Sequence, residues 1–252
     1  MSGLEGSVAL VTGAGQGVGR GIALALAAKG AAVAVTGRTA SKLDSVVAEI
    51  EGRGGRALAV ACDVRDAASL QSCVARVVET LGGLQILVNN AQEVALGPLL
   101  SVDDAAFATG WESGPLATFR LMKLAHPHLS RRGGCIVNLA SSVAMRWDLA
   151  GYGTYAAVKE AIRQLTRAAA CEWAGQGIRT NCILPLGNSP AMDGWTRARP
   201  QEAAAFIATV PQGRVGDCES DIGTFVATLC SDECRYVNGQ SIALDGGQAF
   251  LG

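Results

Sequence analysis

Short runs of apolar residues alternate along the whole chain with longer segments of mixed apolar and polar character. Most short runs are continuously apolar, which is the pattern of parallel strands covered on both faces. Seven runs are predicted strands, at residues 7–12, 32–36, 57–63, 84–89, 134–140, 179–184 and 241–244. Helical spacing predominates between them, at residues 19–29, 42–52, 67–81, 103–129, 152–176 and 219–231. The alternation predicts an α/β fold: a doubly wound, seven-stranded, mainly parallel sheet flanked by helices.

One stretch interrupts this alternation. Residues 186–215 contain no clear strand, but they include three prolines and large apolar side chains such as Trp195 and Phe206. Ligands of a doubly wound sheet bind beyond the carboxyl ends of its strands, so an insertion here is placed to cover a substrate. The alternative is a long surface connection without a function. No linker is visible, and we expect one domain over residues 1–252.

Composition narrows the classes of protein to consider. Hydrophobic residues make up 49% of the chain, charged residues 17%, and the net charge is −1, which argues against electrostatic binding of nucleic acid. No apolar run is long enough to span a membrane, and the first residues lack a signal-peptide pattern. The eight cysteines form no CxxC pair and lie far from both histidines. We therefore expect a cytoplasmic protein without a metal, nucleic-acid or membrane partner.

A glycine-rich turn joins the first predicted strand to the helix that follows it. Residues 13–19 read GAGQGVG, and a side chain at these glycines would keep the backbone away from a pyrophosphate. The following helix offers unpaired N–H groups and the positive end of its dipole. Taken alone, the turn could be purely structural, but strand–turn–helix context favours a dinucleotide site in a Rossmann-type domain. The expected cofactor contacts are Gly13, Gly15, Gln16, Gly17, Val18 and Gly19.

The end of the second predicted strand bears on the choice of cofactor. An NAD site places a carboxylate there, whereas this chain reads VTGRT and the next acidic residue is Asp44. Gly37 leaves space, and Arg38 supplies a bidentate cation suited to a 2′-phosphate. Gln16 brings no second positive charge into the turn, and Arg38 as a solvated surface residue is the alternative. NADP(H) is favoured, and NAD(H) remains possible.

Tyr155 and Lys159 are four residues apart in a predicted helix, so their side chains share one face. An ammonium group about 4 Å from the phenol favours the phenolate by about 4 kcal/mol at an effective dielectric constant near ~20. That corresponds to about 3 pKa units, enough for tyrosine to transfer a proton near neutrality. Ser142, thirteen residues before Tyr155 at the end of a predicted strand, could hold a carbonyl oxygen.

These motifs together resemble the short-chain dehydrogenase/reductase family in its short, single-domain form. The matching segments are TGAGQGVG at 12–19, Asp63–Val64, Asn89–Ala91, the set Ser142, Tyr155 and Lys159, and Asn181 to Pro185. The resemblance implies hydride transfer between nicotinamide C4 and a carbonyl or alcohol carbon. It makes Tyr155 the acid in reduction and the base in oxidation, with Ser142 orienting the substrate oxygen. It implies that Lys159 lowers the tyrosine pKa and binds the nicotinamide ribose.

Further contacts follow from the same resemblance. Asp63 and Val64 are expected at the adenine, and Asn90 along the adenosine ribose. Ser189 is expected in place of the threonine that bonds the nicotinamide carboxamide. The family also implies a homotetramer, with the tail at 244–252 near an interface.

The catalytic serine is ambiguous because two serines are adjacent. Counting forward from Asn138 by the family's strand pattern selects Ser141. Counting back thirteen residues from Tyr155 selects Ser142, which we prefer because residues 143–154 then align without a gap.

The chain departs from the family pattern at two further positions. The family's NNAG reads NNAQ here, which places Gln92 near the expected nicotinamide. Gly114 stands where the family has an asparagine that helps hold a water between the lysine and solvent, and Pro115 follows it. Gly114 and Pro115 should disturb the helix locally. We expect Ser113, Glu112 or an exposed backbone carbonyl to replace the asparagine.

Two functions follow from these patterns. The leading one is an NADP(H)-dependent ketone reductase or alcohol dehydrogenase acting on a small-molecule carbonyl or alcohol. The alternative is a catalytically impaired cofactor-binding protein with a regulatory or scaffold role, which the missing asparagine keeps open.

Overall fold

Seven parallel strands form one sheet in the computed structural model, which describes residues 3–145 and 151–249. In chain order they are β1 (Val8–Thr12), β2 (Ala32–Gly37), β3 (Arg56–Ala61), β4 (Ile86–Asn89), β5 (Gly134–Leu139), β6 (Ile178–Pro185) and β7 (Ser241–Leu244). The order across the sheet is β3-β2-β1-β4-β5-β6-β7, and every neighbouring pair is parallel. The chain reverses its direction across the sheet between β3 and β4, so the switch point lies between β1 and β4. The predicted doubly wound sheet is confirmed.

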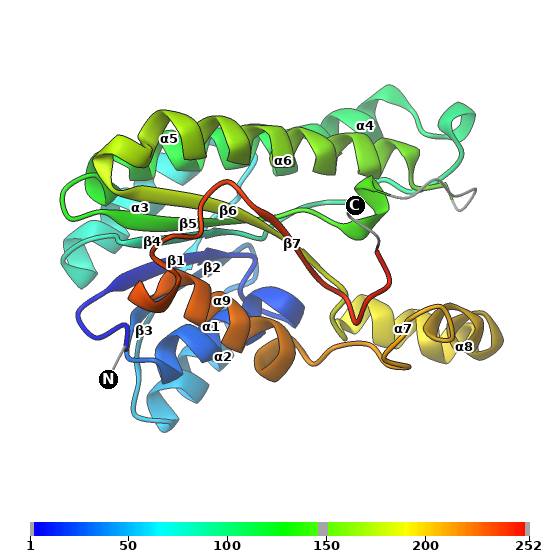
Figure 1. Cartoon of the computed structure of the whole chain (residues 1–252), viewed down its shortest axis with the longest axis horizontal. Helices are drawn as coiled ribbons and strands as arrows, with labels where there is room; N and C mark the ends of the chain where they lie inside the picture. The colour runs from blue at the N-terminus through cyan, green and yellow to red at the C-terminus, as the bar shows by residue number, and fades with distance from the viewer. Residues whose placement is uncertain (1–2, 146–150, 250–252) are drawn as a thin grey trace.

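Helices cover both faces of the sheet (Figure 1). One face carries α1 (Gly17–Ala28), α2 (Ala40–Gly52) and α9 (Thr224–Cys230). The other carries α3 (Ala67–Leu81), α5 (Ala117–Leu129) and α6 (Gly153–Trp173). Alternate residues of β1 therefore enter different cores: Ala9 and Val11 face α1, while Val8 and Leu10 join the opposite core. This two-sided burial is why the strands read as continuous apolar runs.

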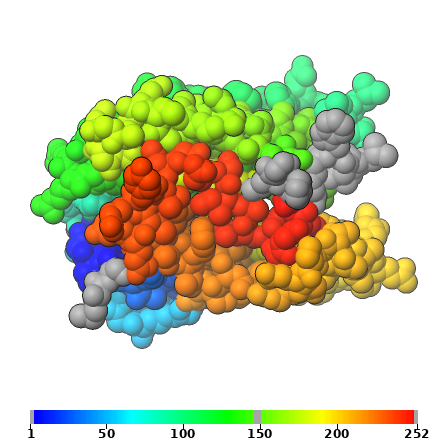
Figure 2. Space-filling view, in the orientation of Figure 1, coloured from blue at the N-terminus to red at the C-terminus, as the bar shows by residue number. Residues whose placement is uncertain are grey.

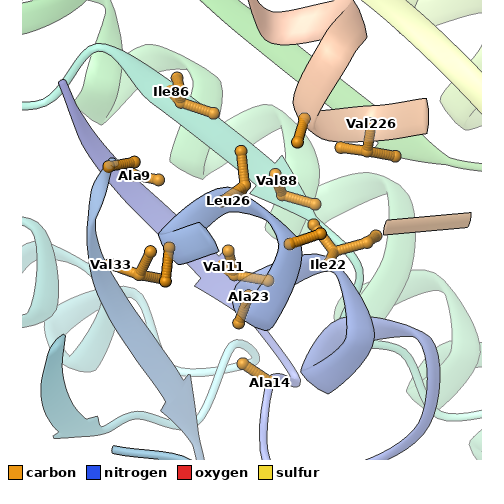
Figure 3. Packing of buried hydrophobic residues seen from close by; sticks show 14 of the residues in the cluster. Ala9, Val11, Ala14, Ile22, Ala23, Leu26, Val33, Ile86, Val88 and Val226 are labelled. Carbon is orange, nitrogen blue, oxygen red and sulfur yellow. The ribbon is translucent and has the colours of Figure 1, made fainter. Parts of the chain in front are cut away.

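Close packing around α1 fixes the position of its N-terminus. Ile22 and Leu26 of α1 lie among buried residues of the sheet and near Val226 of α9 (Figure 3). On its other side α1 touches a π-helical turn, Cys218–Gly223, backbone to backbone. A Cβ added at Gly21 would overlap the carbonyl oxygen of Cys218. The glycine turn that leads into α1 is thus held by the core on several sides.

The long helix predicted at residues 103–129 is divided in the structure. It consists of α4 (Asp104–Trp111), a π-helical turn (Glu112–Leu116) and α5. Pro115 lies inside the π-helical turn and has no N–H to continue an α-helical ladder. The local disturbance expected at Gly114 and Pro115 is therefore present.

The segment that interrupted the alternation contains two helices, α7 (Pro190–Ala198) and α8 (Pro200–Ile207). They lie together beyond the end of β6 and protrude from the molecule (Figures 1 and 2). Each helix begins with a proline, a residue that suits the first helical turn. In the sequence these prolines indicated only an interruption of the alternating strands and helices. The rings of Trp195 and Phe206 pack edge to face at 5.6 Å and join the two helices. No helix in the described ranges is both long and apolar enough to cross a bilayer.

Candidate active site

A groove of about 590 Å³ opens at the carboxyl ends of the strands, where doubly wound sheets bind their ligands. All the residues predicted to bind the cofactor line it, namely Gly13, Gly15, Gln16, Gly17, Val18, Gly19, Arg38, Asp63, Val64, Asn90, Tyr155, Lys159 and Ser189. Segments far apart in the sequence therefore meet at one place. Among the described residues, neither Ser141 nor Ser142 lines the groove itself.

The glycine turn forms a backbone cradle at the start of α1. Gly13 and Gly17 have φ angles of 63° and 56°, a left-handed conformation that favours glycine. A Cβ at Gly13 would lie 2.8 Å from Nδ2 of Asn90. With no side chains in the way, the N-terminus of α1 can approach a pyrophosphate, so the residues present fit a dinucleotide.

Asn90 supports this turn from the neighbouring strand end. Its Nδ2 donates hydrogen bonds to the carbonyl oxygens of Thr12, at 2.8 Å, and Gly13, at 3.2 Å. Its backbone N–H donates to the Thr12 hydroxyl at 2.9 Å. The sequence placed Asn90 along the adenosine ribose; the structure shows its amide nitrogen bonded to the turn.

Two cationic side chains stand at the end of β2. Arg38 Nη1 lies 2.6 Å from Oε1 of Glu93, and the arginine side chain is well exposed. Lys42 Nζ donates to Oε1 of Gln16 at 2.5 Å, so a second positive charge does reach the glycine turn. Sequence reasoning missed Lys42; its signal was a position in the first turn of the helix that follows Arg38. The pair gives this end of the groove the charge that a phosphate needs.

The remaining predicted contacts are tied to local structure. The Asp63 carboxylate accepts from the N–H of Arg65 at 3.0 Å. The Ser189 hydroxyl accepts from the N–H of Met192 at 3.3 Å and caps α7. Ser189 lies against the glycine turn, since a Cβ at Gly17 would be 3.2 Å from its Cβ. Ser189 therefore links the protruding helices to the groove.

Lys159 and Tyr155 share one face of α6, but they do not form the charge pair that the sequence predicted. Lys159 is buried, and its Nζ donates to the carbonyl oxygen of Leu139 at 2.7 Å. Burial lowers the pKa of Lys159 to about 8. Burial also raises the pKa of the Tyr155 phenol, against a lowering by a hydrogen bond with the Ser141 side chain. In this cofactor-free arrangement burial is the largest influence on the Tyr155 pKa and Lys159 is not among the others, so the lowering of that pKa by Lys159 stays a prediction.

Ser141, rather than the preferred Ser142, is the serine that the structure brings to Tyr155. Ser142 is buried at the start of a short 3₁₀ turn. Counting forward from Asn138 stays close to β5, where the spacing is fixed by the strand. Counting back from Tyr155 crosses a loop, where no regular element fixes the spacing. Residues 146–150 of that loop lie outside the described residues.

The π-helical turn shows what stands near Gly114. Glu112 pairs with Arg65 at 3.3 Å away from the groove, so the expectation that it replaces the asparagine is wrong. The Ser113 hydroxyl donates to the carbonyl oxygen of Thr109 at 2.8 Å and accepts from the N–H of Glu93 at 2.9 Å. Ser113 thereby fastens the segment after β4 to this turn.

Comparisons with known proteins agree with this geometry. A family model described as enoyl-(acyl carrier protein) reductase matches residues 13–249. A 12α-hydroxysteroid dehydrogenase of Clostridium sp. is 35% identical over 251 residues, which cover 96% of each chain. A short-chain dehydrogenase from Burkholderia cenocepacia, solved in complex with NADP, has a TM-score of 0.90 at 34% identity, covering 97% of this chain and 98% of that one.

A further solved structure is a 7α-hydroxysteroid dehydrogenase complexed with NADH and 7-oxo glycochenodeoxycholic acid. It has a TM-score of 0.91 at 30% identity, covering 98% of this chain and 96% of that one. Matches over nearly the whole chain confirm the resemblance carried by the separate motifs. The chain belongs to the short-chain dehydrogenase/reductase family of NAD(P)-dependent oxidoreductases.

Proposed function

We propose that the protein reduces a ketone, or oxidises the corresponding secondary alcohol, with NADP(H) as the hydride carrier. The observation that carries this proposal is the single groove that joins the glycine turn and its cations to Tyr155 and Lys159. The steroid dehydrogenases among its relatives act on substrates with this kind of alcohol or ketone group. The scaffold alternative receives no support from those relatives.

Tyr155, Ser141 and Lys159 have different roles in the transfer of the proton. The bound cofactor supplies or accepts the hydride at the substrate carbon. In reduction the Tyr155 hydroxyl donates its proton to the carbonyl oxygen, and in oxidation the phenolate takes it back. Ser141, whose side chain lowers the pKa of the Tyr155 phenol as a hydrogen-bond partner, orients that oxygen when substrate is bound. The Lys159 ammonium stays close, with its Nζ 5.6 Å from the Tyr155 ring centre, and favours the anionic state once the groove is filled.

The preference for NADP(H) over NAD(H) rests on Arg38 and Lys42. Both line the groove beside Gln16, and neither has a carboxylate of β2 next to it that would bind a ribose 2′-hydroxyl. A bidentate guanidinium and an ammonium suit a 2′-phosphate. Glu93 now holds Arg38 and would have to release it when the phosphate binds.

We also propose roles for two surfaces outside the catalytic centre. The protruding α7 and α8 cover the substrate, since Ser189 and Met192 at the start of α7 line the groove.

Trp111 and Phe119 leave apolar surface exposed on α4 and α5, which supports a homo-oligomer, in line with the expected tetramer. The eight free cysteines suit a reducing compartment, which supports a cytoplasmic location.

The test is a set of initial rates on ketones, including a 12-oxo steroid and a small acyclic ketone, with NADPH and NADH. The wild type should prefer NADPH, and Arg38→Ala with Lys42→Ala should remove that preference while Lys123→Ala, an exposed control, should not. A strong preference for NADH would refute the cofactor assignment. Tight NADPH binding without turnover on any ketone would instead favour a scaffold.

The catalytic serine is tested separately. Ser141→Ala should lower kcat by about a hundredfold or more, as expected for a lost contact to the reacting oxygen. Ser142→Ala should retain activity if its buried position is structural. The reverse result would reinstate Ser142.

A further inference from the structure

Gln92 and Gly114 lie on separate segments yet share one volume. A Cβ added at Gly114 would lie 2.7 Å from Nε2 of Gln92 and 2.9 Å from Cγ1 of Val158. The glutamine amide therefore occupies the space into which a side chain on the π-helical turn would project. The chain departs from the family pattern at both positions: Gln92 replaces a glycine and Gly114 replaces an asparagine. The two replacements are coupled in space, because the side chain gained at Gln92 fills the volume that is left free at Gly114.

Neighbouring contacts fix the orientation of the Gln92 amide. The bond from the N–H of Glu93 to the Ser113 hydroxyl holds the backbone beside Gln92 against the π-helical turn. Nε2 of Gln92 donates to the carbonyl oxygen of Gly110 at 3.4 Å, a group that can only accept, which favours this orientation of the amide over the reversed one. Its Oε1 is buried and has no hydrogen-bond partner among the described residues. A buried acceptor left unpaired is costly, so Oε1 is suited to a donor that arrives from outside the chain.

Gln92 reaches both sides of the catalytic tyrosine. It lines the cofactor groove together with Tyr155 and Lys159. It also lines a small cavity behind Tyr155, of about 10 Å³, which Thr154 and Val158 help to enclose. That volume is at the lower limit of what can hold one water molecule. The side chain thus stands where a single polar molecule would touch the proton donor.

We propose that Gln92 is a positioning residue for proton transfer, and that its Oε1 accepts a hydrogen bond from one water beside Tyr155. The glutamine supplies from the segment after β4 the amide that Gly114 lacks. In reduction this water returns a proton to the Tyr155 phenolate and is itself reprotonated from solvent; in oxidation the proton moves from the Tyr155 hydroxyl through the water to solvent, and Gln92 neither gains nor loses one. This inference rests on the proposed ketone reduction, and it explains why an intact tyrosine and lysine can work without an asparagine.

The shared volume is tested in the cofactor-free protein by thermal unfolding. Gly114→Asn should lower Tm by several degrees because its side chain meets the Gln92 amide, and Gln92→Gly combined with Gly114→Asn should recover most of that loss. Gly52→Asn is the control, since nothing lies within 4 Å of a Cβ at that helical glycine. If the double variant instead lost as much Tm as the two single variants together, the two side chains would not share one volume, and this part of the inference would be overturned.

The positioning role is tested with Gln92→Met, which keeps the length of the side chain but removes its amide. With NADPH saturating each protein, as judged by fluorescence titration, we expect kcat to be lower by about tenfold, with a shifted pH profile of kcat and a larger solvent isotope effect. Gln92→Gly combined with Gly114→Asn gives the residues of the family pattern, and its kcat should return to within a few-fold of the wild-type value. Wild-type kcat, pH profile and isotope effect in Gln92→Met would overturn the inference alone. Absence of ketone turnover in the wild type would overturn the proposed function and this inference with it.

Discussion

Replacing Lys159 with methionine should change how the stability of the cofactor-free protein depends on pH. The lysine is buried, and its pKa falls from the ordinary 10.5 to about 8. That difference corresponds to about 3 kcal/mol of unfavourable free energy for burying the ammonium group. The side chain keeps one hydrogen bond, to the Leu139 carbonyl, in either protonation state.

The direction follows from where the proton resides in each state. Below pH 8 Lys159 is charged in both folded and unfolded protein, and the folded state bears the full cost. Between pH 8 and 10.5 the unfolded state holds the proton and the folded state does not, so stability rises with pH. Relative to Lys159→Met, the wild type should therefore gain up to about 3 kcal/mol, roughly 6–12 °C in Tm, across that window.

Urea unfolding at fixed protein concentration, from neutral pH to pH 10.5, measures this difference. Comparing the two proteins cancels the groups that do not interact with Lys159. The Cys182 thiol does interact with it, but burial raises the pKa of that thiol to about 11. Lys123→Met, at an exposed lysine of α5, is the matched control and should track the wild type. If Lys159→Met also tracked the wild type at every pH, the stated cost of burying this ammonium would be refuted.

Three other changes test separate parts of the structure. Glu93→Gln releases Arg38 from its ion pair, so the variant should bind NADPH about threefold more tightly than the wild type in a fluorescence titration. Equal or weaker binding would count against a 2′-phosphate site at Arg38. Gly21→Ala should destabilise the protein by about 3 kcal/mol in urea unfolding, because its Cβ overlaps neighbouring backbone, whereas Gly52→Ala should not. Trp111→Glu should lower the mass of the proposed homo-oligomer in light scattering; a wild type that is already monomeric would refute the oligomer, and an oligomer unchanged by the substitution would place its interface elsewhere.

The fold could be predicted because its signals are local. Strands buried on both faces must be continuously apolar, as at residues 8–11, and each lies near its predicted position. The glycine turn was equally readable, since Gly13 and Gly17 adopt a conformation that few other residues tolerate. Because the turn and the strand ends meet at one sheet edge, the residues lining the groove followed from the fold.

Side-chain contacts across segments were not readable in the same way. Helical spacing put Tyr155 and Lys159 on one face, but the carbonyl of Leu139 decides where the ammonium group lies. Lys42 joined the cofactor site only through the placement of α2 beside the turn. Gln92 and Gly114 each looked like an isolated departure, because only the packed structure shows that they share one space.

The central claim is that Tyr155 and the bound cofactor transfer a proton and a hydride to a ketone in this groove. The most direct measurement incubates NADPH carrying deuterium at both C4 positions with the ketones and follows the alcohol product by mass spectrometry, in wild type and Tyr155→Phe at equal NADPH occupancy. The wild type should place one deuterium on the carbinol carbon, and the variant should bind NADPH but form product at least about a hundredfold more slowly. Deuterated alcohol formed by Tyr155→Phe at the wild-type rate, or none formed by the wild type, would contradict the claim.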